Sequence, residues 1–111
     1  MPKGTVLSEL EQLALLALIR LGTDAYGPSI QRELEVTAGR TLSIATIYVT
    51  LVRLEKKGFV SSWRSDPQPV RGGKAKRFFA VTPAGLKVLN ASRAVMDRMW
   101  KGIEPASGNT K

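Results

Sequence analysis

The chain has 111 residues, 43% of them hydrophobic, and carries 17 basic against 9 acidic residues with no cysteine and no histidine. This length suits one small domain, and the hydrophobic content is that of a globular protein rather than a disordered one. The missing cysteines and histidines exclude disulfides, thiol catalysis and zinc sites of the Cys/His type, and they favour a reducing, cytoplasmic location.

The basic excess is concentrated in the second part of the chain. Residues 1–60 hold seven Lys or Arg against six Asp or Glu, whereas residues 61–111 hold ten against three. A concentrated positive charge indicates a polyanionic partner, with a generally basic, solvated surface as the alternative. No segment reaches the roughly 18 apolar residues that span a bilayer, and the N-terminus has no secretory signal, so no membrane association is expected.

A first helix is predicted from Ser8 to about Leu21. Ser8 and Glu11 have the spacing of a capping box, in which each side chain satisfies a free backbone N–H of the other residue. The helix is apolar nearly all round, so it should be buried on most sides. One small domain offers few ways to surround such a helix, which is a first indication of a second subunit.

A second helix is predicted from the Tyr26-Gly27-Pro28 segment to about Thr37, with Ile30 and Leu34 facing inward. Proline near the first turn is favourable, because the N–H that it lacks would have no partner there. A turn at 38–40 follows, and Thr41-Leu42 is expected to form a short extended piece.

The stretch from Ser43 to Trp63 predicts a third helix that leads directly into a strand. Ser43 is a good N-cap, and Gly58 supplies the left-handed residue that commonly ends a helix. One face carries an apolar stripe of Ile44, Ile47, Leu51 and Leu54. The opposite face is small or basic and has no acid: Ala45, Val49, Val52, Arg53 and Lys56, with Thr46 and Tyr48 at its flanks. Such a helix suits the DNA major groove, although any amphipathic surface helix has two unlike faces.

A hairpin with a basic tip is predicted after this helix. Strands are expected at 59–64 and 75–81, and the two prolines and two glycines of 65–74 prevent regular structure between them. Five cations cluster in the hairpin against Asp66 alone: Arg64, Arg71, Lys74, Lys76 and Arg77. Trp63 is interpreted as a packing residue, and Lys56 and Lys57 as solvated charges at the end of the third helix.

A last helix is predicted from Thr82-Pro83 to about Lys101. A 3–4 spacing forms a short heptad seam of Leu86, Leu89, Arg93, Met96, Trp100 and Ile103. The seam predicts a dimerisation helix, and the alternative is a helix folded back on its own domain. Residues 105–111 are expected to be a flexible tail.

The order of these elements is helix, helix, helix, strand, basic loop, strand, helix. It predicts an α+β, mainly α fold: a winged helix-turn-helix domain over 1–82 and a dimerisation helix over 83–104. In this arrangement the third helix enters the DNA groove and the hairpin, or wing, touches the backbone. Cations at a wing gain affinity by displacing counterions from phosphates, while base contacts supply the sequence preference.

Three motifs resemble the PadR family of bacterial transcriptional regulators. They are Tyr26-Gly27 with Ile30, the pattern from Ser43 through Thr46, Tyr48 and Arg53 to Gly58-Phe59-Val60, and Arg77-Phe78-Phe79-x-x-Thr82-x-x-Gly85. The short C-terminal part is similar to the compact subgroup of this family, in which a single last helix dimerises against the first helix of the partner. The resemblance implies a homodimeric repressor that binds a palindromic operator in double-stranded DNA.

The resemblance also implies site residues. Ser43, Thr46, Tyr48 and Arg53 match the DNA-facing helix, and Lys74 and Lys76 match the wing; the basic tip adds Arg71. Ala45 and Val49 depart from the glycine and proline that are common at their positions, which puts the usual base contacts in doubt and leaves Val49 able to contact thymine methyl groups.

Trp100 has two interpretations. Some members of the subgroup bind flat aromatic molecules between the subunits through a tryptophan of the last helix. The resemblance therefore implies, as one interpretation, that Trp100 binds a small aromatic effector. The alternative is an anchor of the dimer interface.

The sequence predicts no enzyme, because no histidine or cysteine is present, the acids are few and scattered, and no phosphate-binding loop occurs. A metal sensor is disfavoured for the same missing ligands, and no cofactor is expected. The competing prediction is a winged-helix adaptor whose basic wing docks an acidic protein.

Overall fold

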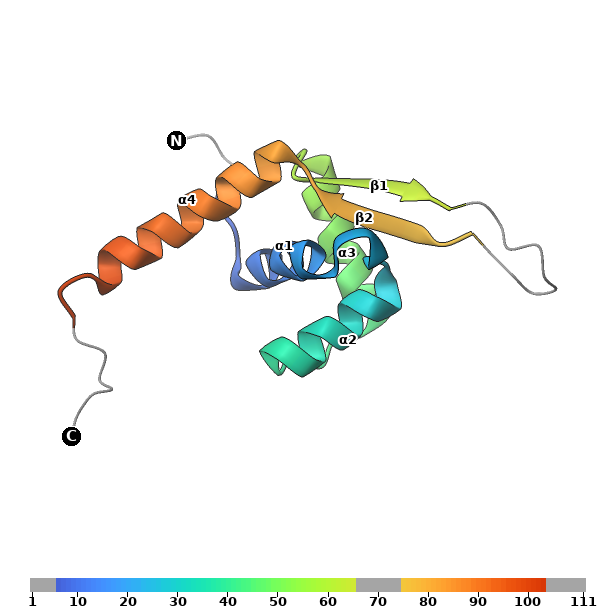
Figure 1. Ribbon diagram of the computed structural model, residues 1–111, viewed down its shortest axis with the longest axis horizontal. Helices are drawn as coiled ribbons and strands as arrows, with labels where there is room; N and C mark the ends of the chain where they lie inside the picture. The colour runs from blue at the N-terminus through green and yellow to red at the C-terminus, as the bar shows by residue number, and fades with distance from the viewer. Residues whose placement is uncertain (1–5, 66–74, 104–111) are drawn as a thin grey trace.

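The computed structural model describes residues 6–65 and 75–103. The elements in chain order are α1 (Glu9–Leu21), the short 3₁₀ helix η1 (Gly22–Asp24), α2 (Gly27–Ala38), α3 (Ile44–Lys56), β1 (Val60–Arg64), β2 (Arg77–Val81) and α4 (Pro83–Trp100) (Figure 1). The predicted order of three helices, a hairpin and a last helix is confirmed. In the described part of the chain, no helix combines the length and the apolar character needed to cross a bilayer.

The helix starts follow the sequence signals. The Ser8 hydroxyl accepts from the Glu11 amide at 3.1 Å, and the Glu11 carboxylate accepts from the Ser8 amide at 2.9 Å, which is the predicted capping box. Ser43 caps α3 through a single bond of this kind, since its hydroxyl accepts from the Thr46 amide at 3.0 Å. Gly58 has a φ of +85°, so the chain leaves α3 through the left-handed residue that was predicted.

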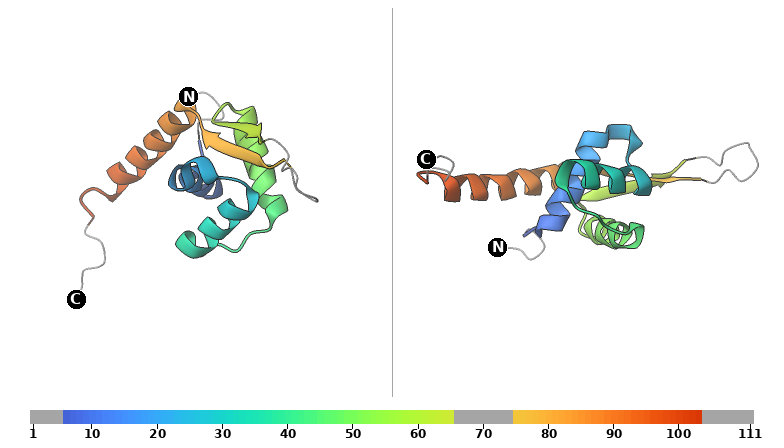
Figure 2. Two further views of the ribbon diagram at one scale, coloured as in Figure 1. Left: turned by 45° about the vertical axis from the view of Figure 1, so that its right-hand side comes forward. Right: turned by 90° about the horizontal axis from the view of Figure 1, so that it is seen from below.

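The core surrounds α1, which packs against α2, α3, β2 and α4 (Figures 1 and 2). Leu15 of α1, Ile30 of α2, Leu51 and Leu54 of α3 and Phe79 of β2 are fully buried there. Ile30 and Leu34 face inward as predicted. The periodic apolar stripes of the helices therefore meet on one central helix.

β1 and β2 form an antiparallel ladder from Val60 opposite Val81 to Arg64 opposite Arg77. A single bridge between Tyr26 and Phe78 adds to this hairpin, and the Phe79 amide donates to the Ala25 carbonyl at 2.9 Å. Thr41-Leu42, predicted as a short extended piece, is not part of the ladder. The Leu42 carbonyl accepts a hydrogen bond from the Gln31 side chain at 2.7 Å, so its partner is a side chain of α2 and not a neighbouring strand.

The beginning of α4 is fixed to the turn between α3 and β1. Thr82 accepts from the Gly85 amide at 3.0 Å and donates to the Gly58 carbonyl at 2.7 Å. A Cβ at Gly85 would lie 2.2 Å from the Phe59 carbonyl oxygen, so only glycine permits this approach. From this anchor α4 runs past α1 and extends away from the rest of the domain (Figure 1).

Candidate nucleic-acid interface

The outer face of α3 is exposed and the inner face is buried. Ala45, Thr46, Val49, Arg53 and Lys56 are exposed, while Tyr48 and Val52 are half-buried. Ile47, Leu51 and Leu54 on the opposite side have at most 2% of their surface exposed. The two-faced helix that the sequence predicted is therefore present, and its small and basic face is open to a partner.

The hydroxyl groups at the beginning of α3 are occupied by the helix itself. The Ser43 hydroxyl accepts from the Thr46 amide and donates its one proton to the Thr46 hydroxyl oxygen at 3.0 Å. The Thr50 hydroxyl is buried and donates to the Thr46 carbonyl at 2.9 Å. Because DNA phosphates only accept hydrogen bonds, Ser43 contacts one as a donor only if it gives up its bond to Thr46.

The one acid of α3 is neutralised. Arg77 of β2 donates to the Glu55 carboxylate at 2.7 Å, and Ser62 donates to the same carboxylate at 2.8 Å. Arg77, which the sequence grouped with the basic tip, is thus committed to an ion pair and also lies 5.2 Å from the Phe79 ring centre. It removes negative charge next to α3 and does not itself add a free cation.

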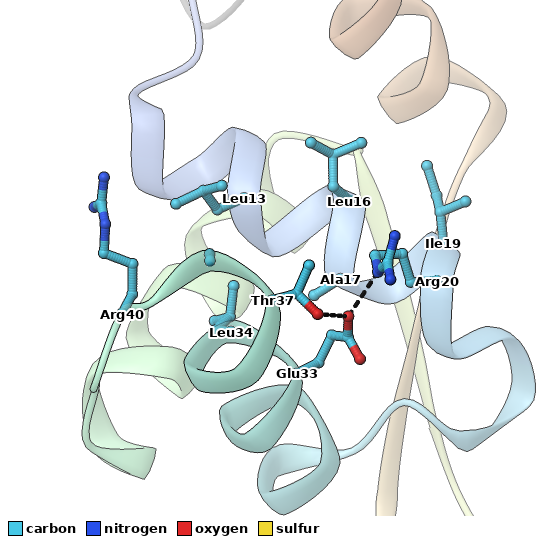
Figure 3. A pocket seen from close by; sticks show the side chains of 10 residues that line it. Leu13, Leu16, Ala17, Ile19, Arg20, Glu33, Leu34, Thr37 and Arg40 are labelled. Atoms are coloured by element: carbon cyan, nitrogen blue, oxygen red, sulfur yellow. Dashed lines mark hydrogen bonds and ion pairs between the residues drawn. The ribbon is translucent and has the colours of Figure 1, made fainter.

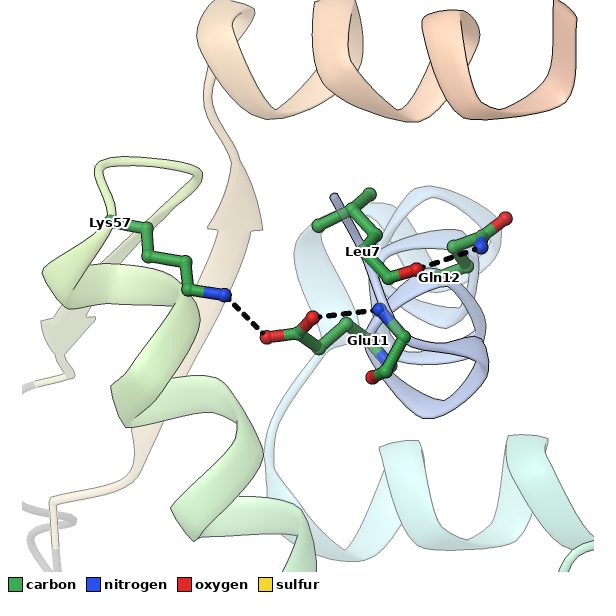
Figure 4. Close-up of polar contacts among 5 residues, drawn as sticks. Leu7, Glu11, Gln12 and Lys57 are labelled. Carbon is green, nitrogen blue, oxygen red and sulfur yellow. Dashed lines mark hydrogen bonds and ion pairs between the residues drawn. The ribbon is translucent and has the colours of Figure 1, made fainter. Parts of the chain in front are cut away.

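Lys57 also differs from its prediction. It forms an ion pair with Glu11 of α1 at 3.0 Å, and the Glu11 side chain is 6% exposed (Figure 4). Lys57 is therefore not a solvated helix-end charge. Burial raises the pKa of the Glu11 carboxyl, but the hydrogen bond from the Ser8 amide and the Lys57 ammonium together lower that pKa below its ordinary value of 4.5.

A hollow of about 380 Å³ lies beside the wing, at the Arg64–Arg77 end of the ladder, and is lined by Tyr26, Tyr48, Arg64 and Lys76 among others. The Lys76 ammonium lies 4.6 Å from the Tyr26 ring centre, a cation–π distance. The Tyr48 ring packs on Phe79, with ring centres 5.8 Å apart. Among the described residues, the Tyr48 hydroxyl makes no hydrogen bond and neither Arg64 nor Lys76 makes an ion pair.

The sequence did not single out the packing around this hollow. A Cβ at Gly27 would lie 3.1 Å from the Tyr48 hydroxyl oxygen. The missing side chain of this glycine therefore leaves room for the Tyr48 ring to pack beside α2. Trp63 stacks on Phe78 with ring centres 6.0 Å apart, in agreement with its predicted packing role. Arg71 and Lys74 lie outside the described residues.

The seam residues of α4 divide into two groups. Leu89 is buried in the core of its own chain next to Val88, so the first turns of α4 are folded back on the domain as the alternative prediction had it. Leu86, Arg93, Met96, Trp100 and Ile103 are exposed. Met99, which the heptad spacing did not include, is the most exposed large apolar residue of α4, at 69%.

A second apolar surface lies on α1 and α2. Leu13, Leu16 and Ile19 of α1 line a groove of about 420 Å³ together with Leu34 and Ala38 of α2, among others (Figure 3). Hydrogen bonds from Thr37 and Arg20 lower the pKa of Glu33 at one side of this groove. Leu16 and Ile19 are exposed, so the apolar side of α1 that the sequence expected to be covered is open in a single chain.

The comparison with known families decides the identity. Residues 15–91 match the model of the transcriptional regulator PadR-like family. The chain belongs to this family. The match runs from α1 into the first half of α4 and includes the whole of α3 and both strands of the wing. The members of the PadR-like family are transcriptional regulators and not enzymes, in agreement with the prediction.

Known relatives support the assignment. The transcriptional regulator Rv3488 of Mycobacterium tuberculosis is 30% identical to this chain over 87 residues, which are 78% of this chain and 77% of the relative. The crystal structure of a PadR family regulator from Eggerthella lenta shares 26% identity with a TM-score of 0.66, over 92% of this chain and 88% of that chain. A PadR-like transcription factor from Bacteroides fragilis has a TM-score of 0.69 at 22% identity, over 81% and 82% of the two chains.

The chain is thus a PadR-like regulator of transcription that acts by binding DNA, and it has the winged helix fold of this family. The roles of single residues in this regulator, including both interpretations of Trp100, remain predictions.

Proposed function

We propose that this PadR-like regulator is a homodimeric repressor that binds a palindromic operator in double-stranded DNA, and so acts in the cytoplasm. The observation that carries the proposal is the arrangement of charge around α3. Arg53, Lys56, Arg64 and Lys76 are exposed and make no ion pair with the described residues, whereas the neighbouring acid Glu55 is paired with Arg77. A surface that exposes its cations and neutralises its acid is suited to a polyanion.

In the proposed complex, the outer face of α3 lies in the major groove. Ala45, Thr46 and Val49 are short enough to approach the base edges, and Arg53 reaches a base or a phosphate. The hollow beside the wing holds a backbone phosphate, with the Tyr48 hydroxyl, Arg64 and Lys76 as donors. Lys74 and Arg71 extend the phosphate contacts along the wing.

The proposed dimer joins two apolar surfaces. The exposed residues Met96, Met99 and Trp100 follow an i, i+3, i+4 spacing, which places them on one face of α4, and the exposed Ile103 lies just beyond the end of this helix. This face packs on the open side of α1 in the partner, next to Leu16 and Ile19. Because each protomer supplies both surfaces, two copies related by a two-fold axis cover each other's exposed apolar residues.

Trp100 is proposed as the anchor of this interface. A flat aromatic effector that relieves repression would stack on the same indole between the subunits. In a Trp63→Phe variant Trp100 is the only tryptophan, so a change of fluorescence when an aromatic dye is added reports on this position alone.

The proposed function is tested by sedimentation with and without the DNA upstream of the gene, at two salt concentrations. We expect a dimer that binds this DNA much more tightly than a scrambled duplex. With about six phosphate contacts per dimer, the slope of log affinity against log salt should be about −5. The two half-sites should lie about 34 Å apart, one turn of B-DNA.

A dimer that binds both duplexes equally would contradict the operator and favour the adaptor with an acidic partner. A monomer at all concentrations would contradict the role of α4.

A further inference from the structure

The outer face of α3 carries two apolar side chains beside Thr46 in its first two turns. Ala45 and Val49 are four residues apart, so they lie above one another on the same side of the helix. Both are exposed, and Val49 has 56% of its surface open. Val49 is the only large hydrophobic residue within Ile44–Lys56 that is exposed to this extent. On a DNA-facing helix such a side chain offers van der Waals contact and no hydrogen bond.

This part of α3 has little capacity for directional hydrogen bonds. The segment from Ile44 to Val52 contains no Asn, Gln, Lys or Arg, the residue types that pair with purine edges. The Thr46 hydroxyl oxygen accepts from Ser43 and keeps one proton to donate, and the Thr50 hydroxyl is buried against the Thr46 carbonyl. Arg53 is the first residue along the helix with a long donor that reaches outward.

The major groove presents one apolar group, the C5-methyl of thymine. We propose that this regulator reads its operator mainly through thymine methyl groups, which contact Ala45 and Val49, and through one guanine that is bound by Arg53. The inference rests on the proposed function, because it assumes that α3 lies in the major groove.

The geometry also sets a spacing. Val49 and Arg53 are about 6 Å apart along the helix axis at 1.5 Å per residue. Successive bases of one DNA strand are about 3.4 Å apart. The guanine is therefore expected within about two base pairs of the thymine that contacts Val49.

The test begins with a selection of bound sequences from random duplexes by the full chain. Each enriched thymine is then replaced by deoxyuridine, which removes only the methyl group. We expect about fourfold weaker binding for each contacted methyl, the effect of one buried carbon. Restoring the methyl as 5-methylcytosine, paired with guanine, should bind more tightly than cytosine at the same position.

The matched variant is Val49→Ala. Because Val49 is exposed, this change should leave the fold unchanged. It should abolish the difference between thymine and deoxyuridine at one position, and the same replacement outside the half-site should have no effect in either protein.

The outcomes separate this inference from the proposed function. Enriched sites whose affinity does not respond to any deoxyuridine would overturn methyl reading while sequence-specific binding stands. Methyl reading would also be overturned if the Val49→Ala variant lost as much affinity as the unchanged protein when thymine is replaced by deoxyuridine. A selection that enriches no sequence would overturn both.

Discussion

The outer face of α3 and the last turns of α4 are both exposed sides of amphipathic helices, but they differ in chemistry. α3 exposes cations and short side chains, with Val49 as its one large apolar group. The end of α4 exposes Met96, Met99 and Trp100, and Ile103 follows directly after it; each is between 53% and 69% exposed. Exposure alone therefore does not define a binding surface. The first surface suits a charged, grooved partner, and the second suits another apolar surface.

The two surfaces are also held in place differently. α3 is fixed along its length by the buried stripe and at its end by the ion pair of Lys57 with Glu11. In the part of the chain that the structure describes, the buried and capping contacts of α4 lie near its beginning, at Thr82, Gly85, Val88 and Leu89. A helix that is held along its length and a helix whose end is open suit the DNA-binding dimer proposed above. Four substitutions separate the two surfaces.

The largest effect is expected at the end of α4. A Met99→Asp change would bury a charge in the proposed interface, so we expect the dimer to weaken by about 100-fold or more. Sedimentation equilibrium measures this change. The control is Ala94→Asp, which adds the same charge on the opposite side of α4. If both variants remain dimeric, this face of α4 is not the interface.

The next effect concerns the anchor of α4. A Gly85→Ala change places a Cβ against the Phe59 carbonyl oxygen, so we expect the free energy of unfolding to fall by about 2–3 kcal/mol. Urea denaturation measures it, with Ala84→Ser at the exposed neighbouring position as control. Equal stabilities of the two variants would show that α4 moves away from Phe59 without loss.

A smaller effect is expected on the DNA-binding face. Arg53→Ala should weaken operator binding about tenfold with no change in melting temperature, because Arg53 is exposed and pairs with no described residue. Fluorescence anisotropy with a labelled operator measures the affinity. Lys87→Ala removes an exposed cation from α4 and serves as the control. An unchanged affinity for Arg53→Ala would remove this residue from the interface.

The smallest effect concerns the ion pair behind α3. Because the pKa of Glu11 is lowered in the folded chain, its carboxylate stabilises the fold above about pH 4.5, and this contribution is lost as the pH falls through the lowered pKa. Glu11→Gln should cost about 1–2 kcal/mol at pH 7 and much less at pH 3. Thermal unfolding of both proteins at both pH values checks this. If the variant were less stable by the same amount at pH 7 and pH 3, the charge of Glu11 would not contribute to stability. Operator binding at pH 7 should be retained.

Much of the fold follows from short-range patterns. The caps at Ser8, Ser43 and Thr82 and the left-handed Gly58 set the helix boundaries to within one or two residues, because such signals act over a single turn. The inner and outer faces of α3 were also predictable, since the helical period alone separates Leu51 from Val49.

Long-range contacts were not predictable in the same way. The sequence counted Arg77 and Lys57 as free cations, but each is paired with an acid 22 or 46 residues away along the chain. The position of Leu89 in the heptad seam was compatible with contact to a partner subunit and also with burial in the core of its own chain. The packing of α4 on α1 places it in the core.

The sequence by itself determined the elements, their order, the family to which the chain belongs and the excess of basic charge. Each of these depends on local sequence patterns or on composition alone. Only the tertiary structure decided which charges remain open and which part of α4 projects beyond the domain. The reason is physical: an ion pair or a buried contact depends on which segments meet, and that is settled by packing around α1 rather than by the spacing of neighbouring residues.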